Sequence, residues 1–101
     1  MNYRVVILPA AERDIDRIVQ WWSQHRSSEQ AERWYRQIYV AISELSDQPE
    51  RLPVAAETDL VPTGLRELHF GLGSRATHRI ILTVIGLKCG CCVCVMPLNK
   101  T

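Results

Sequence analysis

Residues 27–46, SSEQAERWYRQIYVAISELS, decide the fold of this chain. Ser27 and Gln30 form an S-x-x-Q capping box, a pattern whose side chains bind the free backbone N–H groups at the start of a helix. The apolar side chains in this stretch recur at the spacing of one helix face: Ala31, Trp34, Tyr35, Ile38, Ile42 and Leu45. The stretch predicts an amphipathic helix over about residues 28–46, with one face buried against another layer.

A second helix is predicted immediately before it, over about residues 10–25. Acidic side chains at Glu12, Asp14 and Asp16 occupy its first turns, where the helix dipole favours negative charge. The connection is short, so the two helices form an antiparallel hairpin. Their stripes are the only apolar faces long enough to cover a sheet, and these side chains are expected to be buried against one: Ile15, Ile18, Trp22, Trp34, Ile38, Ile42 and Leu45.

Strand-like runs flank the helical hairpin on both sides. The apolar and β-branched runs are residues 3–8, 65–70, 77–85 and 91–96, and glycine-containing turns are expected at 71–74 and 86–90. Prolines make about residues 47–63 an irregular surface loop. We therefore predict an α+β domain of order β-α-α-β-β-β. It consists of an antiparallel sheet of about four strands, with the helical hairpin packed on one face and the other face at least partly open.

Length and composition limit the class of protein. The 101 residues are expected to form one domain, residues 1–101, because two domains of about 50 residues would each be near the lower limit for a self-supporting core. With 47% hydrophobic and 23% charged residues, the composition is typical of a soluble globular protein. No apolar run approaches the roughly 18 residues of a membrane span, and no signal peptide is recognisable. We expect a cytoplasmic protein that does not contact the membrane.

The net charge of +1 is unevenly distributed along the chain. Residues 1–59 hold seven arginines and ten acidic residues, a net charge of −3, whereas residues 60–101 hold five cations and only Glu67, a net charge of +4. Ten of the twelve cations are arginines, whose planar guanidinium groups suit phosphate and carboxylate groups. The second half therefore either binds an anionic partner or carries its charge for solubility alone.

The four cysteines lie close together, at Cys89, Cys91, Cys92 and Cys94. Strand alternation would point the first two to one face and the last two to the other, so they cannot converge on one metal ion. We predict small buried side chains in a reducing compartment. The sequence also lacks metalloprotease, serine hydrolase and phosphate-loop motifs, and we expect neither a metal nor a cofactor.

Five basic side chains fall within fourteen residues of one predicted strand hairpin: Arg66, His69, Arg75, His78 and Arg79. Arg66 shares a strand face with Leu68, and Arg79 shares one with Ile81. Cross-strand pairing would bring the two arginines together in some registers. The alternative for Arg66 is a side chain that is exposed to solvent or paired in a salt bridge. Arg79 begins a strongly apolar run, where a charged side chain without a function is unexpected. The two histidines are acid/base candidates only if they have a partner. The aromatic residues Trp21, Trp22, Trp34 and Tyr35 are expected in the core or the helix interface.

Several stretches together resemble the RelE/ParE superfamily of toxins from type II toxin–antitoxin systems. They are YRVVILPAAERDI at 3–15, AERWYRQI at 31–38, LSDQPERLP at 45–53, GLREL at 64–68 and THRIILTV at 77–84. The resemblance covers nearly the whole chain and implies a small toxin that a cognate antitoxin neutralises by wrapping a segment across it. It also implies contacts with the antitoxin or the target at the five basic residues above, and allows a toxin dimer within the complex.

The superfamily divides by target. A RelE-like member would be a ribosome-dependent mRNA endoribonuclease, and the resemblance would then assign catalysis to Arg79, Arg66 and Lys100. The C-terminal His, Tyr or Arg side chains of that subgroup are missing here, since Lys100 is the only ionisable side chain after residue 96. A ParE-like member would poison DNA gyrase and lack nuclease activity. The longer helical hairpin favours this second interpretation, with the nuclease and a non-toxic binding module or inactive relative as alternatives.

Overall fold

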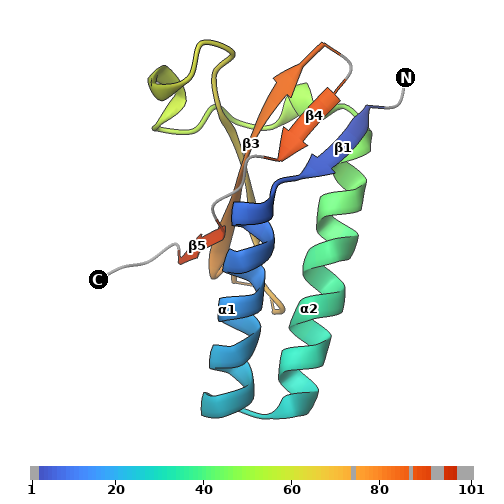
Figure 1. The fold of residues 1–101 in the computed structure, drawn as a ribbon, viewed down its shortest axis with the longest axis vertical. Coiled ribbons are helices and arrows are strands. Elements are labelled where there is room, and N and C mark those ends of the chain that lie inside the picture. Colours follow the sequence, from blue (N-terminus) through green and yellow to red (C-terminus); the bar gives the residue numbers. More distant parts are fainter. Residues whose placement is uncertain (1–2, 74, 87, 92–94, 98–101) are drawn as a thin grey trace.

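The computed structural model describes residues 3–73, 75–86, 88–91 and 95–97. Figure 1 shows two long helices beside a sheet, which confirms the predicted α+β class. The helices and strands are β1 (Arg4–Ile7), α1 (Pro9–His25), α2 (Ser28–Ser43), β2 (Arg66–Phe70), β3 (His78–Ile85), β4 (Lys88–Cys91) and β5 (Val95–Pro97). Three short 3-10 turns lie between α2 and β2: η1 (Glu44–Ser46), η2 (Pro49–Arg51) and η3 (Thr58–Leu60).

The ends of the helices follow from their local sequence. Pro9 is the first residue of α1, where its fixed φ suits the helix and its missing N–H removes no hydrogen bond. Ser27 caps α2, and its Oγ accepts a hydrogen bond from the backbone N–H of Gln30 at 3.1 Å, as the capping box predicts. The predicted helix over 28–46 ends slightly earlier, because its last residues tighten into η1. Neither helix of the described chain is long and apolar enough to span a membrane.

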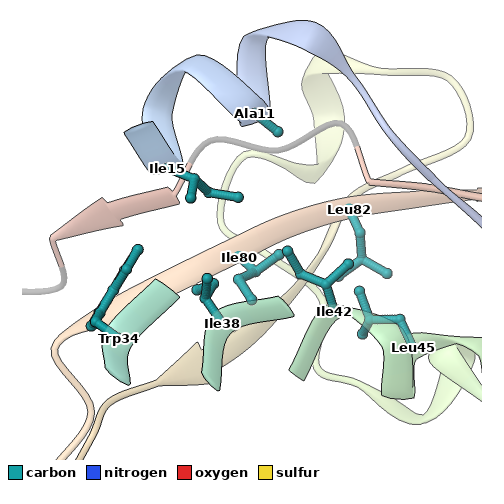
Figure 2. Packing of buried hydrophobic residues seen from close by; sticks show 8 residues of the cluster. All are labelled: Ala11, Ile15, Trp34, Ile38, Ile42, Leu45, Ile80 and Leu82. Atoms are coloured by element: carbon teal, nitrogen blue, oxygen red, sulfur yellow. The ribbon is translucent and has the colours of Figure 1, made fainter. Parts of the chain in front are cut away.

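The main hydrophobic core lies between the helical hairpin and β3. Figure 2 shows Ile38 and Ile42 of α2 pointing toward the strand that carries Ile80 and Leu82. The fully buried set is Ala11, Ile15, Trp34, Ile38, Ile42, Leu45, Ile80 and Leu82. The predicted core residues Ile18 and Trp22 are only partly buried. They lie in the second half of α1, which extends beyond the sheet, as Figure 1 shows.

The sheet order is β1-β4-β3-β2, and β5 pairs with the first residues of β3. Strands β2, β3 and β4 are antiparallel neighbours as predicted, but β1 and β4 are parallel. Parallel neighbours need a long connection, and here it includes both helices and the β2–β3 hairpin. The predicted strand over 91–96 and the turn over 86–90 need correction: β4 begins at Lys88, within that turn, and β5 is separate. Gly86, with a φ of 59°, adopts the left-handed conformation that allows so early a reversal.

The face of the sheet turned away from the helices is partly covered by residues 53–64, here named the covering loop. It pairs with β2 through Val54 and Arg66, and the backbone N–H of Ala55 donates to Leu65 O at 2.8 Å. Ala55 and Leu65 are buried with Ile81 of β3 in a second, smaller apolar cluster. The predicted irregular segment is therefore an ordered cover on the far face of the sheet.

Candidate functional site on the far face of the sheet

The β2–β3 register decides which basic side chains meet. His69 pairs with Arg79, whereas Arg66 pairs with Leu82, so that the two arginines lie on opposite faces of the sheet. The observed register is therefore not one of those that would bring Arg66 and Arg79 together. His78 pairs with Phe70 on the helix face. The candidate site on the far face contains Arg79 and His69, and the carboxylate of Glu67 contacts both side chains.

Arg79 is the centre of this site and is held by two carboxylates. Its Nη1 donates to Glu67 Oε1 at 2.9 Å and to Glu57 Oε1 at 3.1 Å, and its Nη2 donates to Glu57 Oε2. The Arg79 side chain is only 15% exposed. Hydrogen bonds from Arg79, and from the backbone N–H of Glu57 itself, hold the pKa of Glu57 below its ordinary value. The same bonds, first to Glu57 and then to Glu67, raise the pKa of Arg79. Arg79 is thus a compensated cation in a cluster that carries one excess negative charge.

The two carboxylates were not predicted from the sequence. Glu67 lies two residues from His69 on the same strand face, so the correct register alone would have placed it beside Arg79. Glu57 belongs to the covering loop, where no periodic pattern gives the direction of a side chain. It reaches Arg79 across 22 positions of sequence.

The two histidines of the hairpin have different surroundings. His69 extends the charged cluster, since its Nε2 lies 3.3 Å from Glu67 Oε2, and about half of its side chain is exposed. The ring of His78 packs against the ring of Trp34 with centroids 5.3 Å apart, and its Nδ1 lies 2.8 Å from the hydroxyl of Thr77. Burial lowers the pKa of His78. Only His69 is therefore placed to act together with Arg79.

The remaining candidates lie apart from this cluster. Arg66 Nη1 donates to Leu52 O at 2.7 Å and so ties the chain before the covering loop to β2. Arg75 is exposed in the connection between β2 and β3, and Lys100 lies outside the described residues. Cys89 and Cys91 are two residues apart on β4, whereas Cys92 and Cys94 also lie outside the described part. In the described ranges, no three side chains of the metal-binding types are grouped as ligands.

Hydroxyl groups fix the end of the covering loop. The buried Thr83 donates its only hydroxyl proton to Gly64 O at 2.8 Å, so Thr63 must be the donor in the 2.6 Å bond between the two threonines. Thr58 Oγ1 accepts a bond from the backbone N–H of Leu65 at 2.8 Å. Gly64 has a φ of 78°, and a Cβ there would lie 3.0 Å from Thr58 Oγ1, so this position needs glycine. The loop that carries Glu57 is therefore rigidly placed.

The fold of this chain has a counterpart among solved structures. The chain is similar to a solved structure described as "Chromosomal ParDE TA system from P. aeruginosa", with a TM-score of 0.77 and 16% sequence identity. The match covers 96% of this chain and 97% of that chain, and at this identity it shows the fold. A comparison with curated proteins found no match.

The sequence itself gives the family. The model described as "ParE toxin of type II toxin-antitoxin system, parDE" matches residues 5–88. The chain belongs to the ParE toxin family. The resemblance to the RelE/ParE superfamily is thereby confirmed, with ParE as the subgroup.

Proposed function

We propose that this chain is the toxin of a type II toxin–antitoxin module that stabilises plasmids, that it inhibits growth by poisoning DNA gyrase in the cytoplasm, and that a cognate antitoxin neutralises it. The observation that supports this most is the ParE family match over residues 5–88, together with a shared fold along nearly the whole chain. A type II toxin requires a protein antitoxin, so that partner follows from the family.

The charge of the far face favours a protein target over RNA. A ribosome-dependent nuclease needs cations that are free to stabilise the scissile phosphate. The guanidinium of Arg79 is instead shared by Glu57 and Glu67, and a phosphate approaching it meets a net negative cluster. Catalysis by Arg79, Arg66 and Lys100 is the alternative, and it would require Arg79 to exchange a carboxylate for the RNA.

The antitoxin is expected to bring acidic side chains to the second half of the chain. The residues proposed to meet it or the target are Arg66, Arg75, Arg79, His69 and His78. Arg75 is exposed and open to such a contact, as is the half-exposed ring of His69. Arg79 meets an incoming carboxylate only by sharing its guanidinium or by releasing Glu57.

Inducible expression with and without the antitoxin gene tests this function. The toxin alone should halt growth with stalled replication and DNA-damage signalling while translation continues, and co-expression of the antitoxin should restore growth. Purified toxin should trap gyrase on cleaved DNA in a supercoiling assay. Messages cut in the ribosomal A site, with cutting lost in a folded Arg79→Ala variant, would instead establish the nuclease.

A further inference from the structure

Leu60 is the most exposed large hydrophobic side chain of the described residues, at 80%. It is the last residue of η3 in the covering loop, and Figure 1 shows this yellow-green turn at the upper left, away from both helices. A single exposed leucine is ordinary on a protein surface, so its exposure alone is no argument for binding. Two further properties of this turn distinguish it: its rigidity and its charge.

The backbone that carries Leu60 is fixed on both sides. The N–H of Leu60 donates to Glu57 O at 2.9 Å, and the N–H of Gly64 donates to Val61 O at 2.9 Å. Val61, the next residue, packs onto the second apolar cluster, while Glu57, just before η3, is held by Arg79. A side chain presented on a fixed backbone loses little conformational entropy when it binds. Leu60 therefore has the property of a preorganised anchor.

The segment that carries Leu60 is acidic. The covering loop, residues 53–64, contains Glu57 and Asp59 and no basic residue, and the carboxylate of Glu57 is paired with Arg79. Asp59 is exposed directly beside Leu60. Nucleic acid would be repelled here, and so would the acidic antitoxin segment proposed above. The complementary surface is an apolar pocket of a folded protein with Lys or Arg side chains at its rim.

We propose that the covering loop contacts the protein target of the toxin, with Leu60 inserted into such a pocket. Arg79 is then a positioning residue that acts through Glu57, because their ion pairs hold the start of η3 against β3. The identity of the target as gyrase rests on the proposed function. The role of Leu60 does not, since it is measured by growth inhibition whatever the target is.

Leu60→Ser tests the anchor, with Val40→Ser as the matched control. Val40 is 49% exposed on α2, so both variants remove an exposed aliphatic side chain without disturbing the cores. Leu60→Ser should raise the toxin concentration needed for growth inhibition and for gyrase trapping by roughly tenfold or more, as expected for an anchor residue. Its affinity for the antitoxin should equal that of the parent protein. Val40→Ser should match the parent in all three measurements.

Glu57→Ala tests the positioning role. As a single substitution, Glu57→Ala should weaken growth inhibition, but by less than Leu60→Ser does. It should not lower the affinity for the antitoxin. In the Leu60→Ser background it should have almost no further effect, because a misplaced loop no longer matters once the anchor is gone. A general loss of structure would instead lower antitoxin affinity and add fully to the effect of Leu60→Ser. Either of those two results would overturn the positioning role.

The other outcomes are equally distinct. Growth inhibition by Leu60→Ser equal to that of the parent would disprove the anchor and leave gyrase poisoning untouched. Unchanged toxicity with lost antitoxin binding or lost self-association would likewise overturn it, and would reassign Leu60 to that contact. If the parent is toxic without affecting gyrase, the proposed target is wrong, while a toxicity loss confined to Leu60→Ser still supports the anchor. A protein that is not toxic at all refutes both proposals.

Discussion

The two faces of strand β3 hold the molecule together by different means. Ile80 and Leu82 point toward the helices and are fully buried among aliphatic and aromatic side chains. Arg79 and Thr83 point the other way and bind the covering loop through ion pairs and hydroxyl bonds. Ile81, between them, adds only a small apolar cluster. The contacts on the helix face are therefore stabilised by buried apolar area, and those on the far face by directional ion pairs and hydrogen bonds.

This difference separates stability from the presentation of a binding surface. Apolar packing is not directional, and losing part of it weakens the whole domain. Ion pairs and hydrogen bonds fix the path of one segment, so losing one changes the loop more than the fold. The comparison predicts that damage to the helix face is global and that damage to the far face is local.

The largest effect is expected from Ile38→Ala. Ile38 is fully buried at the centre of the helix-facing core, so its truncation leaves a cavity and should lower the free energy of unfolding by about 2–5 kcal/mol. Val40→Ala on the exposed side of the same helix should change it by less than about 0.5 kcal/mol. Urea unfolding of the two variants measures both. Equal effects would mean that α2 does not pack on β3 as described.

A smaller and local effect is expected from Thr83→Val. Valine keeps the shape of the side chain, but it leaves the carbonyl of Gly64 without its hydroxyl donor and the hydroxyl of Thr63 without its acceptor. This loss should lower the free energy of unfolding by about 1 kcal/mol. Amide hydrogen exchange should become faster at Gly64 and Leu65. In α2 it should change only as much as the lower free energy of global unfolding requires. Thr63→Val retains the bond from Thr83 to Gly64 and serves as the milder control. Exchange that becomes faster by the same factor in the loop and in α2 would show that the covering loop does not open independently of the rest of the domain.

The sequence predicted the helix face much better than the far face. A period of 3.6 residues and a capping serine define α2, and Trp34, Ile38 and Ile42 are buried as predicted. The partner of Arg79 depends on strand register and on the path of an irregular loop, and neither has a local pattern. The sequence therefore has no signal for Glu57, and it leaves open whether Arg66 and Arg79 share a face of the sheet. The parallel pairing of β1 with β4 is equally a property of long-range contacts.

The smallest expected effect is on the pH dependence of stability, and it comes from His78 on the helix face of the sheet. Burial lowers the pKa of this ring below its ordinary value of 6.5, because the folded protein disfavours the charged form. The unfolded chain therefore binds a proton first as pH falls, and stability that is complete above pH 6.5 is lost below it. His78→Phe keeps an aromatic ring against Trp34 but cannot titrate. Between pH 7.5 and 5.5, the free energy of unfolding should fall less in this variant than in the parent protein. An equal fall in both would assign the acid sensitivity to other groups and leave His78 as packing alone.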